Sequence, residues 1–429
     1  MKGTHSLFVA AIAWLALGAR ADDWPQWRGP KRDGVWRESG ILEMFPSDGL
    51  KIRWRAQVGP GYSGVVVAKG RVYVSDCQLK PESIERVLCF DEATGKPLWT
   101  YSYPCTYEGL YYGAGPYATP IVQKGRIYVC GPLGHLHCLD AATGEVIWRK
   151  DRAREYKAIL PSCGCNSSPL IEGNLLIVMG GGRADGCVMA FDKDTGEEKW
   201  TALAERPGGS SPIVIEAGGR RQVIFWTLDS VASLDPATGN VFWQVPTKVS
   251  NDGGALTTPA VWKDLALLVC EKAMLIRLAS DKPAAELVSQ TWPRKNINTF
   301  VSPVFLDEHH YYSAYYDDLC CFDVVTGKQV WRAKNVSGGH GNAMFQMTPN
   351  GRSVFILNED GKLILARLAP EGYTEIGRTP LLDPTMGTWT PASGRPKIWA
   401  QPAYANGHIF ARSDKEVVCA SLEAMPLAR

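Results

Sequence analysis

The chain has 429 residues, of which 45% are hydrophobic and 21% charged, so it is long enough to bury a large core. Its formal net charge is +2, and residues 1–21 contain Lys2 and Arg20 but no acidic residue, so the rest of the chain is neutral. This balance argues against nucleic acid or an anionic membrane as the main partner, because both are bound by an excess of Lys and Arg.

Residues 1–21 have the features of a secretory signal peptide. Lys2 supplies positive charge, Leu7–Leu17 is an apolar run, and Ala19-Arg20-Ala21 is an A-x-A cleavage site. The run is too short to cross a bilayer as a helix, so we expect no integral membrane segment in the mature chain. The first cysteine is Cys77, which argues against a lipoprotein anchor. We predict cleavage after Ala21 and a periplasmic or secreted protein.

Residues 22–49 are predicted to be an N-terminal extension that packs on the domain after it. The segment Trp24–Pro30 contains two tryptophans within seven residues, and such large apolar rings favour burial. The following run, Leu50–Trp54, has the pattern of a single β-strand. We assign residues 50–425 to one domain.

A nine-residue phrase, Asp-x-x-Thr-Gly-x-x-x-Trp, occurs five times between apolar runs, which predicts strand, tight turn and strand. The Asp carboxylate can accept backbone N–H groups in the turn, and the Gly can take the positive φ of a bulged hairpin. The Trp is large enough to fill the gap between stacked sheets. We therefore interpret these residues as structural: Asp91, Gly95, Trp99; Asp140, Gly144, Trp148; Asp192, Gly196, Trp200; Asp235, Gly239, Trp243; Asp323, Gly327, Trp331.

A second recurring feature, a Ser/Thr-Pro element, stands upstream of the copies from Asp140 onward and leads into an apolar strand. Examples are Thr119-Pro120, Ser168-Pro169 and Ser211-Pro212. Together the two features define a unit of four strands. Degenerate copies span Thr258–Trp292 and Ala343–Ile376, and the last, Ala400–Leu422, has only three strands.

The missing strand of the last unit lies at the other end of the domain. Pairing of residues 50–58 with the three C-terminal strands would close a ring and remove its open edges. The predicted fold is therefore all-β, an eight-bladed β-propeller of four-stranded antiparallel blades. Seven blades is the alternative, because the degenerate copies are weak. We expect a monomer.

The twelve cysteines do not have the spacing of a disulfide framework. Cys89, Cys138 and Cys321 stand two residues before the repeat Asp, where another copy has Ala190, so they behave as small buried residues. Cys163 and Cys165 lie in a Gly-rich loop and are the better candidates for a disulfide or a redox role.

The repeats resemble those of the PQQ-like β-propeller family, named after the quinoprotein alcohol dehydrogenases. The resemblance covers residues 22 to about 425, and Asp23–Pro30 with Asp33-Gly34 is similar to the mature N-terminus of exported bacterial members. It implies the fold more strongly than the cofactor, since relatives include both quinone-dependent dehydrogenases and a non-enzymatic outer-membrane assembly lipoprotein.

The resemblance also implies what a quinone site would need. In the dehydrogenases PQQ lies between a Trp and a disulfide of adjacent cysteines, beside a Ca²⁺ bound by Glu and Asn, with an Asp as base. Here Cys320-Cys321 is adjacent but lies within a predicted strand, whose side chains alternate between faces. No Glu, Asn and Asp set matches the calcium site. We therefore expect no cofactor and no metal, with PQQ and calcium as the minority hypothesis.

Propellers bind ligands at the mouth of the central channel, where loops enter the innermost strands. Unlike the repeated turns, these loops differ between units, which indicates a specialised surface. The predicted binding residues are Tyr111, Tyr112, Asn166, Asn251, Asp252, Asn298, His340, Asn342 and Trp399. The favoured hypothesis is a non-catalytic scaffold that binds a protein or a polar small molecule. The alternatives are a PQQ-dependent dehydrogenase that oxidises an alcohol or sugar, and a carbohydrate-binding or carbohydrate-processing protein.

Overall fold

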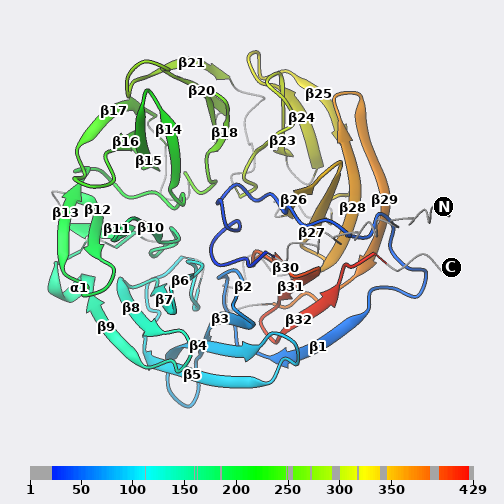
Figure 1. Cartoon of the computed structure of the whole chain (residues 1–429), viewed down its shortest axis with the longest axis horizontal. Helices are drawn as coiled ribbons and strands as arrows, with labels where there is room; N and C mark the ends of the chain where they lie inside the picture. Colours follow the sequence, from blue (N-terminus) through cyan, green and yellow to red (C-terminus); the bar gives the residue numbers. More distant parts are fainter. Residues whose placement is uncertain are drawn as a thin grey trace, which may run out of the picture.

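The computed structural model describes residues 22–111, 113–158, 160–161, 163–183, 186–247, 249, 255–270, 273–291, 300–315, 318–338, 345–386 and 396–424. Within these ranges, 32 strands form eight four-stranded antiparallel sheets arranged as blades around a central axis (Figure 1). The predicted eight-bladed propeller is therefore confirmed. Among these residues the structure has no helix with the length and apolarity that a bilayer crossing requires.

The first four blades follow one another along the chain. Blade 1 contains β2 (Val66–Ala68), β3 (Arg71–Gln78), β4 (Ile84–Asp91) and β5 (Pro97–Pro104). Blade 2 contains β6 (Ile121–Gln123), β7 (Arg126–Cys130), β8 (His135–Asp140) and β9 (Val146–Asp151), followed by the single turn α1 (Arg152–Glu155). Blade 3 contains β10 (Leu170–Glu172), β11 (Leu175–Arg183), β12 (Gly186–Asp192) and β13 (Glu198–Ala202). Blade 4 contains β14 (Ile213–Ala217), β15 (Arg220–Trp226), β16 (Ser230–Leu234) and β17 (Val241–Pro246).

The other four blades include the two degenerate copies and the closing blade. Blade 5 contains β18 (Ala260–Trp262), β19 (Leu265–Val269), β20 (Ala273–Leu278) and β21 (Ala285–Thr291). Blade 6 contains β22 (Val304–Phe305), β23 (His310–Tyr315), β24 (Asp318–Asp323) and β25 (Gln329–Ala333). Blade 7 contains β26 (Phe345–Asn350), β27 (Ser353–Asn358), β28 (Lys362–Ala369) and β29 (Gly372–Pro380). Blade 8 contains β30 (Ala403–Ala405), β31 (His408–Arg412), β32 (Glu416–Ser421) and, as its outermost strand, β1 (Ile52–Gln57).

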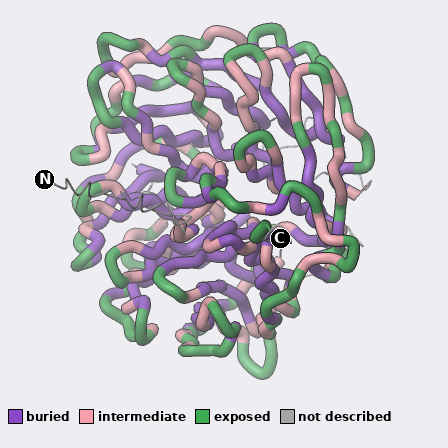
Figure 2. The backbone as a smooth tube through the Cα atoms, turned by 45° about the vertical axis from the view of Figure 1, so that its right-hand side comes forward, coloured by how far each residue is buried: buried purple, intermediate pink, exposed green. Residues whose placement is uncertain are grey.

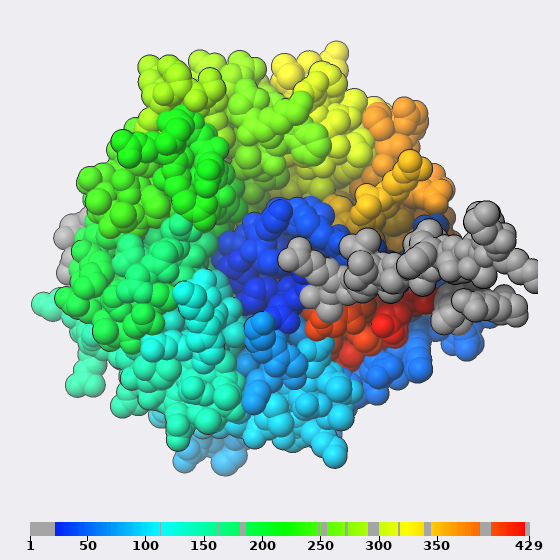
Figure 3. Space-filling view, viewed as in Figure 1, coloured from blue at the N-terminus to red at the C-terminus, as the bar shows by residue number. Residues whose placement is uncertain are grey.

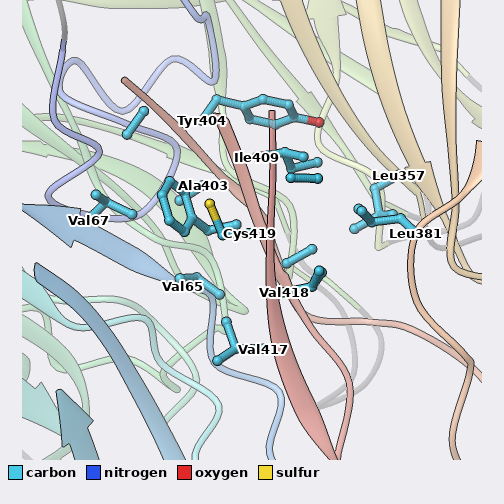
Figure 4. Close-up of a cluster of buried hydrophobic side chains, with 14 of the residues drawn as sticks. Val65, Val67, Leu357, Leu381, Ala403, Tyr404, Ile409, Val417, Val418 and Cys419 are labelled. Carbon is cyan, nitrogen blue, oxygen red and sulfur yellow. The ribbon is translucent and has the colours of Figure 1, made fainter. Parts of the chain in front are cut away.

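The pairing of β1 with β32 closes the ring, as the sequence predicts. Trp54 lies opposite Cys419, and Gln57 lies opposite Glu416. The core beside this closure packs blade 8 against blades 1 and 7, with Val67, Tyr404 and Val418 buried together (Figure 4). Burial is concentrated in the strands, whereas the turns at the periphery are exposed (Figure 2).

Each repeat turn is held by its Asp and bends at its Gly. In the first copy the Asp91 carboxylate accepts the backbone N–H of Thr94 at 2.9 Å and its hydroxyl at 2.6 Å. The five repeat glycines all have positive φ, between 65° and 78°. The register slips directly after Cys89, which pairs with Trp99, so each turn closes a bulged hairpin. The small residue before the repeat Asp is therefore the cross-strand partner of the repeat Trp.

The repeat Trp joins each blade to the next. The indole of Trp148 packs against Gly196 of blade 3, and its Nε1–H donates to the carbonyl of Lys193 at 3.0 Å. Trp54, Trp99, Trp200 and Trp331 make the equivalent bond to the following blade, with Nε1–O distances between 2.7 and 3.2 Å. Trp243 bonds Gln222 of its own blade instead. The next blade has Ser280–Pro283 in place of the repeat turn.

The N-terminal extension enters the central channel (Figure 3, blue). Trp24 forms a two-way backbone bridge with Val67, at 2.9 and 3.0 Å. Further along, the buried guanidinium of Arg32 donates to the carbonyls of Ser168, Pro169 and Pro212 at 2.8 to 3.2 Å. The extension thus bonds to inner strands or the loops entering them in blades 1, 3 and 4.

Candidate functional site

The Ser/Thr-Pro elements form a belt that lines the channel and links neighbouring inner strands. Side-chain oxygens of one blade accept backbone N–H groups of the blade before it, as in Ser211 Oγ with Ser168 N and Ser302 Oγ with Thr258 N, both 3.0 Å. These hydroxyls are therefore engaged as structural hydrogen-bond acceptors. The belt fixes the residues on its rim, because each rim residue is only two or three positions from an anchored backbone.

A hollow of about 130 Å³ lies on the channel axis inside this belt, and we call it the axial cup. Seven blades contribute the residue that stands three positions before the Pro of the element, or before its counterpart Val65 in blade 1. In ring order these are Tyr62, Tyr117, Asn166, Gly209, Leu256, Phe300 and Trp399. One position therefore recurs around the ring with a different side chain in each blade.

Four of these residues form an aromatic arc along one side of the cup. Phe300 lies nearly parallel to Trp399, with ring centroids 6.1 Å apart and an interplanar angle of 19°. Trp399 is 5.9 Å from Tyr62, which in turn is 5.3 Å from Tyr117. The Trp399 ring is fixed further by its Nε1–H, which donates to Glu359 at 2.9 Å. The arc is a continuous and anchored apolar wall.

Carboxamides and small residues complete the cup. Gln401 donates its Nε2–H to Gln346 Oε1, and both side chains line the cup. On the opposite side of the cup, a Cβ built on Gly209 would lie 2.2 Å from the side chain of Leu256 and 2.7 Å from that of Asn166. Gly at the rim position of blade 4 therefore lets the Leu256 and Asn166 side chains pack closely on the side of the cup away from the aromatic arc.

The N-terminal extension closes the floor of the cup. Trp27 lines it from below, and its Nε1–H donates to Thr258 Oγ1 at 2.8 Å. The cup is therefore a blind hollow rather than a passage through the ring.

The predicted binding residues fall into three groups. Asn166 and Trp399 stand in the wall of the cup, whereas Tyr111 is 64% exposed and is not part of that wall. The others lie outside the described residues: Tyr112, Asn251, Asp252, Asn298, His340 and Asn342. Sequence reasoning missed Tyr62, Tyr117, Phe300, Gln346 and Gln401. For three of these, the fixed offset from the Ser/Thr-Pro element or its counterpart is a signal that could have found them.

The adjacent cysteines do not fit the quinone site that the family resemblance implies. Cys320 packs with Tyr311 and Phe322 on one face of β24, whereas Cys321 packs with Tyr312 on the other. A disulfide between neighbours would need both thiols on one side of a distorted turn. All twelve cysteines, including Cys163 and Cys165, are buried. Among the described residues no three His, Cys, Asp or Glu side chains are grouped so that they could hold a metal ion.

A separate buried cluster of titratable groups lies where blades 1 and 2 meet. The Glu85 carboxyl is fully buried and accepts hydrogen bonds from the hydroxyls of Tyr103 and, at 2.9 Å, Tyr107. Burial raises the pKa of Glu85 to about 7, against the opposing effect of the two hydroxyl donors. Next to it, burial lowers the pKa of His137 to about 3, so this imidazole is neutral. None of these residues lines the axial cup.

Glu85 makes the stability of the protein depend on pH. The folded carboxyl keeps its proton up to about pH 7, whereas the unfolded one loses it near its ordinary pKa of 4.5. The contribution of the protonated Glu85 carboxyl to the free energy of unfolding is therefore full below pH 4.5 and is lost as pH rises through 7. At about 1.4 kcal/mol per pKa unit, this contribution amounts to about 3 kcal/mol. Urea unfolding should show the free energy of unfolding of the wild type declining between about pH 5 and about pH 8, and we expect Glu85→Gln to remove this decline. The exposed control Glu108→Gln should retain it; a decline that persists in Glu85→Gln would assign it to other groups.

The comparisons with known proteins give one sequence family and several similar folds. A model of the family described as outer membrane protein assembly factor BamB matches residues 83–333. BamB from Moraxella catarrhalis is 16% identical with a TM-score of 0.58, over 87% of this chain and 99% of that chain. Quinohemoprotein alcohol dehydrogenase from Comamonas testosteroni is 16% identical with a TM-score of 0.67, over 96% of this chain and 82% of that chain.

A third similar structure was computationally designed. The protein Ika8 is 12% identical with a TM-score of 0.54, over 87% of this chain and 100% of that chain. A comparison with curated proteins gives no match. At these identities the structural likeness shows the fold alone.

Proposed function

We propose, because this chain belongs to the family described as outer membrane protein assembly factor BamB, that it is an exported, non-catalytic propeller that binds a partner or ligand in the axial cup. The propeller folds of BamB and of a quinohemoprotein alcohol dehydrogenase are both similar to this one, so the fold alone does not choose between binding and catalysis. The chemistry of the cup favours binding.

The observation that carries the proposal is the composition of the cup wall. None of the described residues that line the cup is Asp, Glu, His, Cys, Lys or Arg. These are the groups that most often carry proton transfer or nucleophilic attack, and the wall offers only the hydroxyls of Tyr62, Tyr117 and two serines in their place. The two lining serines, Ser211 and Ser302, already accept backbone N–H groups in the belt. Aromatic faces and carboxamides are suited to recognition rather than to proton transfer.

The opposite faces taken by Cys320 and Cys321 also support the non-catalytic proposal. We expect that mature protein mixed with PQQ and Ca²⁺ gives neither a stoichiometric change in the PQQ absorption spectrum nor alcohol- or sugar-dependent dye reduction. A quinoprotein dehydrogenase reconstituted in the same buffer is the positive control. Stoichiometric PQQ binding with turnover would refute the non-catalytic proposal.

Site-specific photo-cross-linking tests where binding occurs. Benzoylphenylalanine replaces Tyr62 in the cup wall, and in a matched protein it replaces Leu98, which is 46% exposed on the edge strand β5. After irradiation in the native host, we expect position 62 to give an adduct of defined mass that position 98 lacks. This adduct should be lost when Phe300→Ala removes part of the aromatic arc.

Two outcomes would contradict binding in the cup. One is that position 62 gives only the adducts that position 98 also gives. The other is an adduct at position 62 whose yield does not change with Phe300→Ala, since that residue shares the wall of the cup.

A further inference from the structure

The aromatic arc offers flat apolar surface to whatever enters the cup. Lys397 lies 3.9 Å from the centroid of the Trp399 ring, and it lines a neighbouring hollow rather than the cup. Trp399 itself lines both hollows, so its ring also contributes surface to the cup. With Tyr62 and Phe300 beside it, the wall presents the electron-rich faces of aromatic rings, which attract the partly positive hydrogens of a ligand's C–H bonds.

The polar groups of the cup are neutral and both donate and accept hydrogen bonds. Asn166, Gln346 and Gln401 each carry a carbonyl oxygen and an amino group. The hydrogen bond between Gln401 and Gln346 orients these two side chains relative to each other. Neighbouring hydroxyl groups of a ligand, each of which donates and accepts, match such carboxamides.

A charged ligand would find no opposite charge among the described residues of the wall. Burial of an unpaired charge costs far more than burial of a hydroxyl that finds a hydrogen-bond partner. The closed floor at Trp27 also prevents a chain from threading through the ring. The cup therefore suits one uncharged unit with an apolar face and a hydroxylated edge, entering from the open end.

On these grounds, and resting on the proposed function of the cup, we infer that the ligand is a neutral saccharide, bound as a single pyranose ring or as the end unit of a glycan. One face of the pyranose stacks on the Trp399 side of the arc. Its ring hydroxyls bond the carboxamides of Gln401, Gln346 and Asn166. No covalent step is involved.

Calorimetric titration of the full mature protein tests this inference, with maltotriose, cellotriose and triacetylchitotriose as probes. We expect at least one of them to bind with a Kd below about 10 mM and to change tryptophan fluorescence. Trp399→Ala should weaken that binding at least about tenfold, and Gln401→Leu should weaken it as well, because a buried hydroxyl loses its partner. Phe300→Ala is the second aromatic variant, since Phe300 has no ring nitrogen that bonds a buried carboxylate.

The matched control is Tyr111→Ala, which removes an exposed aromatic ring that is not part of the cup wall. It should leave sugar binding unchanged. The inference is overturned if no probe sugar binds up to about 10 mM, or if binding is unaffected by both Trp399→Ala and Phe300→Ala. It is also overturned if the adduct at position 62 is a protein, in which case the proposed binding role of the cup stands and only the ligand class is wrong.

Discussion

Replacement of Trp148 by alanine is expected to lower the free energy of unfolding by about 3–5 kcal/mol. The indole is only 8% exposed, fills the space between blades 2 and 3, and donates to the carbonyl of Lys193. The substitution leaves a cavity and an unpaired carbonyl between two blades. The measurement is the urea midpoint together with the melting temperature, followed by circular dichroism.

Two glycines with the same φ separate the contact from the backbone strain. Gly196 and Gly70 both have φ of +74°, but a Cβ at Gly196 would lie 2.8 Å from the Trp148 ring, whereas a Cβ at Gly70 meets nothing within 4 Å. Gly70→Ala should cost about 1–2 kcal/mol for the left-handed backbone alone. Gly196→Ala should cost clearly more in the wild type, and no more than Gly70→Ala once Trp148 is alanine. Additive effects would show that Trp148 and Gly196 are not coupled.

Substitution of Arg32 by methionine is the second large expected effect, with a loss of about 3–5 kcal/mol. The guanidinium bonds the carbonyls of Ser168, Pro169 and Pro212, and methionine leaves all three without this donor inside the channel. Urea unfolding measures the loss, and limited proteolysis of the N-terminal extension reports its release. Arg32→Lys should recover only part of the unfolding free energy lost in Arg32→Met, because one ammonium group lacks the planar fork of donors.

The control for Arg32 lies in the same segment. Arg37 is an exposed arginine that pairs with Asp33, so Arg37→Met should cost about 0–1 kcal/mol. Equal losses for Arg32→Met and Arg37→Met would mean that the buried guanidinium does not anchor the extension.

Much of the scaffold could be predicted because its signals are local. The Asp, Gly and Trp of each phrase act within one turn or on the next blade, so nine residues are enough to show the hairpin. The resemblance to the PQQ-like propeller family is confirmed, as are the ring closure and the eight blades. The degenerate blade 5 keeps its bulge between Leu275 and Ile276 although its turn sequence differs, because the bulge belongs to the strand pairing of the whole ring.

The anchoring of the extension could not be predicted in the same way. Arg32 bonds backbone carbonyls 136 to 180 residues away, and a carbonyl has no sequence signature. The burial of Trp24 is a different case, since its large apolar ring is visible in the sequence.

The site was predicted only in part for a related reason. The sequence shows that the mouth loops differ between blades, but which side chain in each loop faces the axis depends on register. The belt fixes that register. The offset from its Pro then points to Tyr117 and Phe300, and the same offset from Val65 points to Tyr62. Gln346 also stands three positions before a Pro, but this Pro349 lies inside β26 rather than before it, so the place of Gln346 in the cup wall follows only from the folded ring.

The central claim is that the repeated residues build the ring and the varied residues of the cup bind. The most direct test measures the cross-link yield at position 62, per folded protein, in two tryptophan variants. Trp331→Ala, in a repeat turn, should lower the melting temperature and leave the yield unchanged. Trp399→Ala, in the cup wall, should abolish the yield while the protein remains folded. Loss of yield with Trp331→Ala together with full yield in Trp399→Ala would contradict the claim.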